Sequence, residues 1–421
     1  MAPIQLSDIA HRRYNPLKDT WVLSVSPHKF KRPRQGQKES ILPVAKPPYD
    51  HKCYLCPGNF RASGDLNPTY AGSFLFENDF STVRMDEGHY EGDDCHHNTS
   101  QGSSFDMLRA EPVIGRCYVL VYSERHNYNF SDMTHLEVKG IVDVWGTVYA
   151  RHISTEDPLG MALAHTKRRD SSCGEHCSRN TALKYMQIFD NNGPTVGASN
   201  PHPHGQIWIT SSIPDEANQE FAQMSNYYKH HGGSHLLQDY AQLEIAKEER
   251  IVYQNEAFLV VCPWWSIWPY EVLLLPKMHI SRLVDLSELK RFCLADAMLQ
   301  VTRAYDNLFG IPFPYISGIH QAPLNATKAE LDRSYLHMHF SPPLLFPNIK
   351  KFFGGCELFG EPTRELLPEV AAKHLRYSIS QLPKDCAICK NPCTQLRANT
   401  VTILKRPLNG ERLRAEAISS C

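Results

Sequence analysis

The feature of this sequence that most constrains its fold is a pattern that occurs twice along the chain. In residues 117–206 and again in residues 271–341, a strand-like segment leads to a histidine, a helix-like segment, and a strand-like segment with two histidines one residue apart. These two pairs are His202 with His204 and His337 with His339. A plan repeated at this scale predicts two tandem structural units.

Each unit is expected to contain one amphipathic helix. Ser131 is placed to cap the first helix. The apolar residues that share one face of this helix are Val138, Ile141, Trp145 and Val148. The corresponding residues of the second helix are Leu289, Phe292 and Leu299. We therefore expect an α+β fold in which a helix packs beside the strands of each unit.

The stretch SNPHPHGQIW, residues 199–208, carries polar side chains at every second position. Ile207, Trp208, Ile209 and Thr210 favour a strand over HGQIWIT, residues 204–210. Side chains two residues apart in a strand point to the same face, so His202, His204 and Gln206 are expected on one side. The alternative is a solvent-facing strand with incidental histidines. The two flanking prolines, which restrict the backbone, and the glutamine favour a site.

Composition points to a small-molecule partner. The 421 residues include 44 lysines and arginines and 45 aspartates and glutamates, so no net field attracts nucleic acid or a membrane. The start of the chain lacks the apolar core of a secretory signal, which predicts a cytoplasmic protein. The most apolar run, residues 257–276, is interrupted by Pro263, Pro269 and Glu271. It is expected to form two buried strands and a turn.

The repeat divides the chain into three parts. Residues 1–212 hold the first unit, residues 213–377 the second, and residues 378–421 form a tail of uncertain structure. Residues 151–180 are polar and lack clear periodicity, so they are expected to be an insertion at the surface of the first unit.

The 13 cysteines of an apparently unsecreted chain are expected to be thiols and metal ligands rather than disulfides. The clustered ones are Cys53 with Cys56, Cys173 with His176 and Cys177, and Cys386 with Cys389 and Cys393. The last two clusters allow an additional zinc site formed by Cys173, Cys177, Cys386 and Cys389. The alternative for them is a set of solvated thiols.

Several motifs occur together in a recognisable order: HRRYNPL, SPHKFKRP, CYLCPGN, NDF, SNPHPHGQIW, GIHQAPL, LHMHFSPPLL and KKFFGGCE. Over roughly residues 10–375 the chain resembles the galactose-1-phosphate uridylyltransferases, the transferase branch of the histidine-triad superfamily. The resemblance implies an antiparallel half-barrel made of two tandem histidine-triad-like repeats with flanking helices. It also implies a homodimer whose active sites draw on both chains.

The resemblance assigns the chemistry to His204. A neutral imidazole is nucleophilic near pH 7 because its free pKa is about 6.5. His204 would take the uridylyl group from UDP-glucose, release glucose 1-phosphate and pass the group to galactose 1-phosphate. Gln206 stands where histidine-triad hydrolases have a third histidine. Its amide can donate a hydrogen bond to a phosphoryl oxygen, but it cannot activate water, so transfer is expected rather than hydrolysis.

The resemblance also implies two metal sites. Cys53, Cys56, His126 and His202 match a four-coordinate zinc site, which would be structural because no coordination position is open. Glu220, His320, His337 and His339 match a second site for iron or zinc. The alternative for the second set is a histidine cluster without a metal.

Other positions match substrate contacts of the family. Those for nucleotide and phosphates are Lys29, Arg32, Asn78, Asp79, Asn191, Gly197 and Ser199, and those for the hexose phosphate across the dimer interface are Lys351 and Glu357. The chain departs from the family pattern at Lys29, Ala198, Gly354 and Cys356. These departures bear on affinity for the sugar phosphate.

Two other functional classes stay open from the sequence. One is a histidine-triad nucleotidyltransferase or phosphorylase that acts on a different dinucleotide, because the loops that select base and sugar carry no clear signal. The other is a non-catalytic metal-binding relative, which the extra cysteine clusters and the altered sugar site favour.

Overall fold

The computed structural model describes residues 5–25, 45–85, 110–153, 183–383, 400–405 and 414–419, the last two ranges by their backbone alone. Its main feature is a sheet of eleven strands in the order β16-β15-β3-β4-β6-β5-β10-β11-β9-β8-β7. Neighbouring strands are antiparallel except for β15 and β3, which are parallel. The expectation of an α+β fold is thereby confirmed.

Four strands and one helix of the first half form a continuous block of this sheet. The strands are β3 (Phe74–Glu77), β4 (Gly115–Val121), β5 (Tyr185–Asn192) and β6 (His204–Thr210), and the helix between β4 and β5 is α2 (His135–His152). Strand β6 lies between β4 and β5, so the strand that carries His204 is paired on both edges. Such pairing fixes the direction of its side chains.

The second half contains a block with the same connectivity. Its strands are β8 (Phe258–Val261), β9 (Val272–Pro276), β10 (Tyr315–His320) and β11 (His337–Ser341), and the helix between β9 and β10 is α6 (Glu288–Phe309). Strand β11 lies between β9 and β10, as β6 lies between β4 and β5. The two blocks meet where β5 pairs with β10. The apolar run 257–276 supplies β8 and β9, as expected.

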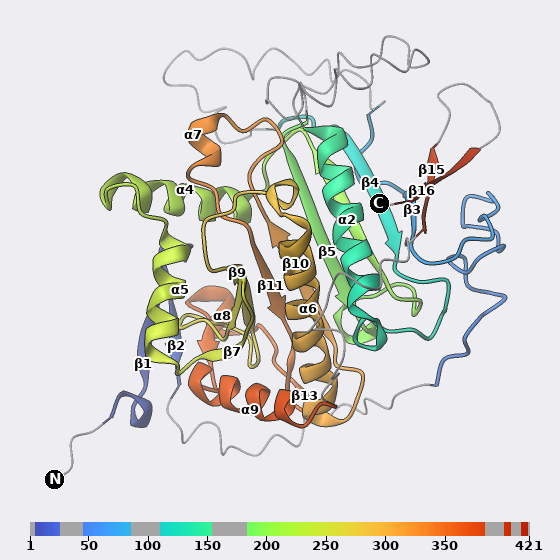
Figure 1. Ribbon diagram of the computed structural model, residues 1–421. Helices are drawn as coiled ribbons and strands as arrows, with labels where there is room; N and C mark the ends of the chain where they lie inside the picture. The colour runs from blue at the N-terminus through green and yellow to red at the C-terminus, as the bar shows by residue number, and fades with distance from the viewer. Residues whose placement is uncertain are drawn as a thin grey trace.

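Helices α2 and α6 lie side by side across one face of the sheet (Figure 1). Alternate residues of the strands point toward these helices, for example Ile207 and Ile209 of β6 and Met338 and Phe340 of β11. They form one continuous core with α2, α6 and α9 (Pro368–Ser380). Because neighbouring residues of a strand point to opposite faces, His204 and His339 lie on the face away from α2 and α6.

The opposite face is covered by other segments. Helix α5 (Leu236–Lys247) packs on β8 and β9 in a second apolar cluster, joined by Met224 of α4 (Asp215–His230). A third cluster joins Cys53 and Cys56 to β3 and β4. These segments place polar residues close to the histidines of β6 and β11.

Helix α2 begins later than Ser131. Thr134 is its N-cap and accepts a hydrogen bond from the Glu137 backbone N–H, while the Glu137 carboxylate accepts one from the Thr134 N–H. This reciprocal capping box supplies partners to two amide groups that are otherwise unpaired at a helix start. Ser131 instead donates its hydroxyl to Asp306 of α6. The expected cap was therefore wrong by three residues.

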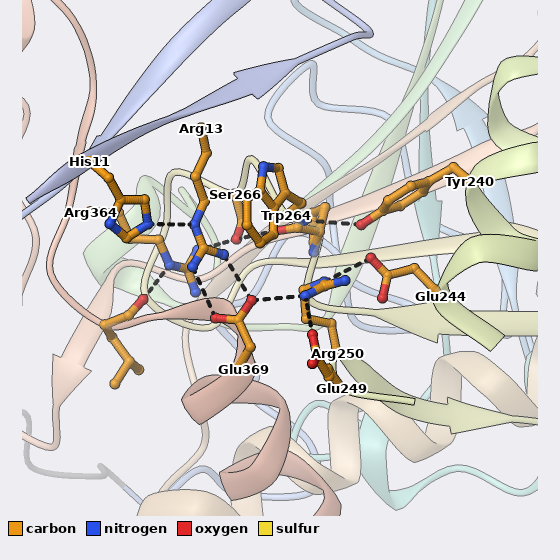
Figure 2. Close-up of polar contacts among 12 residues, drawn as sticks. His11, Arg13, Tyr240, Glu244, Glu249, Arg250, Trp264, Ser266, Arg364 and Glu369 are labelled. Carbon is orange, nitrogen blue, oxygen red and sulfur yellow. Dashed lines mark hydrogen bonds and ion pairs between the residues drawn. The ribbon is translucent and has the colours of Figure 1, made fainter. Parts of the chain in front are cut away.

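A buried ionic network joins strand β1 (His11–Asn15), near the start of the chain, to the second half of the molecule (Figure 2). Arg13 of β1 and Arg250 both pair with Glu369 of α9 at 2.9 Å. Arg250 also pairs with Glu244 of α5 at 2.8 Å. Each buried charge has an opposite partner, and removing one partner would leave an uncompensated charge in the interior.

Arg364 lies beside this network, and its hydrogen bonds go to uncharged oxygen atoms. It donates to the main-chain oxygens of Trp268 and Pro269. It also donates to the Ser266 hydroxyl, which lies beside it in Figure 2. Arg364 belongs to β14 (Thr363–Arg364), which joins β1 and β2 (Thr20–Ser24) in a small sheet. This sheet is thus fastened to the turn between β8 and β9.

The other elements are short. They are β7 (Ile251–Gln254), α7 (Lys328–Leu331), the hairpin of β12 (Leu344–Phe346) and β13 (Ile349–Lys350), and α8 (Cys356–Phe359). The tail contributes β15 (Thr400–Lys405) and β16 (Arg414–Ser419) to the edge of the main sheet, and α9 crosses the expected boundary at residue 378. None of the helices in these ranges combines the length and apolar character needed to cross a membrane. The expected insertion lies almost entirely outside the described residues.

Candidate active site and metal centres

Strand β6 presents His204 and Gln206 on the face away from α2 and α6. The strand alternates between half-buried and buried residues, with Gly205, Ile207 and Ile209 on the buried side. The strand begins at His204, so His202 precedes it. His202 is completely buried. The sequence placed His202 in the same row as His204, whereas the structure places His202 outside the strand.

His204 is held in one tautomer by the backbone. Its Nδ1 atom lies 2.8 Å from the carbonyl oxygen of His202. A carbonyl oxygen only accepts, so Nδ1 carries the proton and Nε2 has a lone pair. Burial lowers the pKa of His204, while the hydrogen bond to His202 acts to raise it. The neutral ring with an unprotonated Nε2 is the form of imidazole that attacks an electrophile.

Gln206 is oriented by Trp208. The Trp208 Nε1–H donates to Gln206 Oε1 at 3.1 Å. Because this contact occupies the amide oxygen, the NH₂ group of Gln206 remains to donate a hydrogen bond to a ligand. Trp208 is itself held edge-on by Phe189 of β5, with ring centroids 5.4 Å apart. The strand therefore presents a nucleophile and a neutral hydrogen-bond donor two residues apart.

The segment between β5 and β6 lies beside these two side chains. Phe189 pairs with Gln206 in the antiparallel ladder, so Asn191 is level with His204. Gly197 has a φ of 87° and ends a short 3₁₀ helix, a conformation that favours glycine. Ser199 is exposed. Three of the predicted phosphate contacts thus come from β5 and the loop that precedes His204.

Asn78 and Asp79 follow β3 directly. The Asn78 side chain accepts the Phe80 backbone N–H at 3.0 Å. Asp79 is paired with Arg61, whose Nε lies 3.3 Å from the Asp79 carboxylate. Arg61 also pairs with Asp65 at 2.9 Å and lies over the Phe76 ring. Asp79 is therefore held by a buried arginine.

Cys53, Cys56, His126 and His202 form a compact buried group whose ligand atoms all lie within 4.8 Å of one another. Cys56 Sγ is 3.5 Å from His202 Nδ1 and 3.6 Å from His126 Nδ1, and Cys53 Sγ is 3.8 Å from His202 Nδ1. The edge between sulfur and nitrogen in a tetrahedral zinc site is about 3.6 Å. The spacing and the donor set therefore fit a zinc ion.

The surroundings of this group also fit a cation. Burial raises the pKa of Cys56 to about 12, so a thiolate there requires a nearby positive charge. The His202 Nε2–H donates to the carbonyl oxygen of Ser123 at 2.8 Å, which leaves Nδ1 directed at the cysteines. Asn200 accepts the His202 backbone N–H and lies 3.5 Å from Cys53 Sγ.

Glu220, His320, His337 and His339 form the second group, also within 4.8 Å of one another. Glu220 comes from α4, His320 from β10 and the other two from β11. One oxygen of Glu220 lies 2.7 Å from His320, 2.9 Å from His337 and 3.7 Å from His339.

The electrostatics of this second group fit a cation as well. Burial acts to raise the pKa of Glu220, but His320 and His339 hold it well below its usual range. The Nε2 atom of His339 is buried without a hydrogen-bond partner. An ionised carboxylate, two oriented imidazoles and an unpartnered nitrogen in one place are a donor set for iron or zinc.

Lys351 and Glu357 contact each other. The Lys351 ammonium lies 3.0 Å from Glu357 and donates to the carbonyl oxygens of Ile267 and Thr363. Glu357 accepts from the backbone and the hydroxyl of Thr363. Among the described residues, these hydrogen bonds and this ion pair do not connect Lys351 and Glu357 to His204 or Gln206.

The remaining predicted site residues lie outside the described ranges: Lys29, Arg32, and the clusters of Cys173, His176, Cys177, Cys386, Cys389 and Cys393. Three residues beside the site were missed from the sequence: Tyr122 behind β6, Trp208 beside Gln206, and Asn200 beside Cys53. A signal for the first existed, because a glycine between His204 and Gln206 indicates a close approach by another group.

Solved structures share this fold. One is described as the structure of uridylyltransferase, with a TM-score of 0.61 and 22% identity over 88% of this chain and 98% of that chain. Another is an ADP-glucose phosphorylase from Arabidopsis thaliana solved with bound ADP-glucose, with a TM-score of 0.58 and 20% identity over 87% of this chain and 98% of that one. The likeness defines an α+β fold of the uridylyltransferase type.

Sequence comparison defines the family. The family model for the N-terminal domain of galactose-1-phosphate uridyl transferase matches residues 2–214, and the model for the C-terminal domain matches residues 219–387. Relatives named galactose-1-phosphate uridylyltransferase include one from Hypocrea jecorina, 50% identical over 88% of this chain and 96% of the relative. One from Neurospora crassa is 48% identical over the same shares. One from Haemophilus influenzae is 40% identical over 87% of this chain and 93% of the relative.

The chain belongs to the galactose-1-phosphate uridylyltransferase family. This confirms the resemblance seen in the motifs and the expectation of a nucleotidyltransferase.

Proposed function

We propose that the protein transfers a uridylyl group from UDP-glucose to galactose 1-phosphate, giving UDP-galactose and glucose 1-phosphate, as in galactose metabolism by the Leloir pathway. The observation that carries this proposal is the hydrogen bond from His204 Nδ1 to the His202 carbonyl oxygen, at 2.8 Å, with the oriented amide of Gln206 on the same face of β6. Family membership supports the choice of substrates.

In the first half-reaction, His204 Nε2 attacks the α-phosphorus of UDP-glucose. The N–P bond forms, the bond from this phosphorus to the bridging oxygen breaks, and glucose 1-phosphate leaves with that electron pair. The proton on Nδ1 stays on the ring, and the hydrogen bond to the His202 carbonyl oxygen stabilises the positive charge that develops. The second half-reaction reverses these steps with galactose 1-phosphate as the attacking group.

Gln206 supports the transfer without moving a proton. Its NH₂ group donates to a non-bridging phosphoryl oxygen, which gains negative charge in the transition state. No acid is needed, because a sugar phosphate leaves as a stabilised anion whose second pKa is about 6. No base for water stands at this position, so the uridylyl-histidine waits for a sugar phosphate.

The nucleotide is placed across the strand ends beside His204. In this proposal the residues that contact nucleotide and phosphates are Lys29, Arg32, Asn78, Asp79, Asn191, Gly197 and Ser199. Lys351 and Glu357 bind the hexose phosphate of a neighbouring subunit in a homodimer. The Lys351–Glu357 contact then opens to admit the sugar phosphate. The proposal places the enzyme in the cytoplasm.

The metal groups have supporting roles. Cys53, Cys56, His126 and His202 hold a structural zinc, which fixes the loop that precedes His204. Glu220, His320, His337 and His339 hold iron or a second zinc. In this proposal neither metal group takes part in the transfer reaction itself.

We also propose that the two halves, residues 1–212 and 213–377, are tandem histidine-triad-like repeats that form a half-barrel, with residues 378–421 outside the repeat. The matching strand orders β3-β4-β6-β5 and β8-β9-β11-β10, each with one helix at the same place in the connectivity, support this.

The experiment that tests the function is exchange of labelled glucose 1-phosphate into UDP-glucose without galactose 1-phosphate. A free-standing uridylyl-histidine predicts exchange and ping-pong kinetics. A panel with ADP- and GDP-sugars, and with phosphate as acceptor, separates this activity from that of a phosphorylase or another nucleotidyltransferase. Absence of exchange and of transfer with every donor would indicate a non-catalytic relative.

A further inference from the structure

The back of strand β6, on the side of α2 and α6, is contacted by Tyr122. This residue directly follows β4, and its backbone N–H donates to the carbonyl oxygen of Pro203 at 3.3 Å. Its side chain is 5% exposed and belongs to the main apolar core. The ring is held edge-on by Phe130, with ring centroids 5.5 Å apart. Tyr122 is therefore fixed beside the start of the strand that carries His204.

The Tyr122 ring reaches behind β6 at Gly205. A β-carbon added to Gly205 would lie 2.3 Å from the Tyr122 hydroxyl oxygen and 3.1 Å from the ring carbon that bears it. The same β-carbon would lie 3.3 Å from the carbonyl oxygen of Phe189, on β5. The hydroxyl thus occupies the place of a side chain at the residue between His204 and Gln206. It approaches β5, the strand on the other side of β6.

Asp190 lies on β5, the strand that the Tyr122 hydroxyl approaches. It is 9% exposed, follows Phe189 and precedes Asn191. Asp190 and Tyr122 line the same small cavity between the sheet and the helices. Burial raises the pKa of Asp190 to about 7, and the Tyr122 hydroxyl acts to lower it. Burial and Asp190 together raise the pKa of Tyr122. The two groups therefore interact across the back of β6.

We propose that Tyr122 and Asp190 are positioning residues for the transfer reaction: together they span β4, β6 and β5 behind Gly205 and hold His204 and Gln206 level with Asn191. This rests on the proposed role of His204. Neither residue reaches the reacting atoms, because both lie on the face of the sheet opposite to His204.

The physical reason is the precision that the transfer requires. His204 Nε2 and the Gln206 amide must meet the same phosphoryl group, and a displacement of about 1 Å can reduce such a rate about 100-fold. A loop precedes His204, the first residue of β6, so this end of the strand is positioned by the groups packed against its rear face. A ring packed against a residue without a side chain sets that position within a fraction of an ångström.

The first test compares Tyr122→Phe with Tyr315→Phe. Tyr315 lines the same cavity and is 3% exposed, but it lies on β10, two strands away from β6, and is not one of the groups nearest to a β-carbon at Gly205. We expect Tyr122→Phe to lower the maximal exchange rate about tenfold, with unchanged Kd for UDP-glucose and a melting temperature within about 2 °C of the wild type. Tyr315→Phe should retain the wild-type rate. Equal rates for the two variants, or a rate loss in Tyr122→Phe that only follows a loss of stability, would overturn the proposal.

The second test asks whether the hydroxyl and Gly205 act on each other. Gly205→Ala places a methyl group where the hydroxyl lies, so the strand or the ring must move, and we expect the exchange rate to fall about 100-fold or more. Removing the hydroxyl in Tyr122→Phe/Gly205→Ala relieves the shorter contact and should recover the rate at least tenfold over Gly205→Ala. A double variant no faster than Gly205→Ala would overturn the contact as the cause.

Asp190 is tested by Asp190→Asn and Asp190→Ala. The amide keeps the size and an acceptor for the Tyr122 hydroxyl, so Asp190→Asn should retain most of the rate, whereas Asp190→Ala should match Tyr122→Phe. An Asp190→Ala variant with the full exchange rate would remove Asp190 from the proposal. Absence of exchange in the wild type would instead refute the proposed function, and with it any positioning role.

Discussion

Each half of the molecule places two histidines one residue apart at the start of equivalent strands, and the two pairs have different surroundings. His202 lies just before β6, whereas His337 is the first residue of β11. In the first half, His202 turns toward two cysteines and His204 is left with a hydrogen bond to a backbone carbonyl oxygen. In the second half, both His337 and His339 face Glu220. Strand geometry is shared, so the difference lies in what the neighbouring segments bring to each strand.

The second strand has neither of the two features that define the first. Helix α4 extends over β11 and inserts Glu220, whereas His204 donates to a backbone carbonyl oxygen and forms no ion pair with a carboxylate of the described residues. Ser341 stands where Gln206 stands in the first strand, and its short side chain ends in a hydroxyl and offers no amide to a phosphoryl group. A histidine at this spacing is therefore a nucleophile or a ligand according to its neighbours. Spacing alone does not decide.

The largest expected effect separates these two roles. His204→Gly should lower glucose 1-phosphate exchange on the order of 10⁴-fold or more, with metal content and fold retained. Added imidazole should partly restore attack on UDP-glucose by filling the vacated space. The matched control, His339→Gly, should retain most exchange. The measurement is exchange with and without imidazole, and a reversed pattern would show that the nucleophile has been placed in the wrong half.

The next effect concerns the metal groups. His202→Asn removes a ligand from the buried cysteine group, so zinc per chain should fall, and the melting temperature with it, because structural zinc stabilises the folded state. The activity that remains should follow how much protein stays folded and zinc-bound. His337→Asn should lower metal content at the second group alone. Elemental analysis and thermal unfolding of both variants check this. Retained zinc in His202→Asn together with lost exchange would mean that His202, not His204, carries the uridylyl group.

Whether a feature of the two halves could be predicted from the sequence depends on how far apart its residues lie along the chain. The apolar run that forms β8 and β9 and the two metal groups were predictable, because alternation and ligand spacing are local or family-wide signals. The cap of α2 was assigned to Ser131 although the Thr134–Glu137 capping box was present in the sequence.

For other contacts, no local signal identified both partners. The hydroxyl of Tyr122 behind Gly205 joins residues 83 positions apart, and nothing at either position states which partner it meets. The contact between Lys351 and Glu357 and the parallel pairing of β15 with β3 are set by chain folding as a whole. The strand predicted over HGQIWIT has the bounds of β6, His204–Thr210, but the row of side chains expected on one face did not extend back to His202. His202 precedes the strand and lies against Cys53 and Cys56.

A smaller effect compares the two buried carboxyl groups. Burial raises the pKa of Asp190 to about 7, whereas the pKa of Glu220 is held low by its histidines. A raised pKa means that the folded state binds the proton more tightly. The stability this confers is fully present below the unfolded pKa of about 4, and it is lost as the pH rises through about 7. The groups that face Asp190 include Tyr122 and Tyr315, which stay neutral in this range.

Asp190→Asn should remove this dependence. Relative to the wild type, the variant should gain about 2–4 kcal/mol in the free energy of unfolding between pH 4 and pH 8. Denaturant unfolding at several pH values measures the difference, and Asp306→Asn is a useful comparison because burial raises that pKa only to about 6. Parallel pH profiles for wild type and Asp190→Asn would show that Asp190 is ionised in the folded protein.

The smallest expected effect on the transfer comes from the second half itself. Glu220→Gln keeps the shape of the side chain but removes the charge that faces the histidines. The affinity of this group for its metal should therefore fall about 10–100-fold. Strands β6 and β11 are separated by β5 and β10, which places them about 14 Å apart at a spacing of about 4.8 Å per strand. Effects at such a distance are nearly independent of each other, so exchange should stay within about threefold of the wild type. The control is Glu216→Gln, which alters an exposed carboxylate of the same helix paired with Lys18. If Glu220→Gln abolished exchange while Glu216→Gln did not, the two halves would share one catalytic unit, and the division between a nucleophile strand and a ligand strand would not hold.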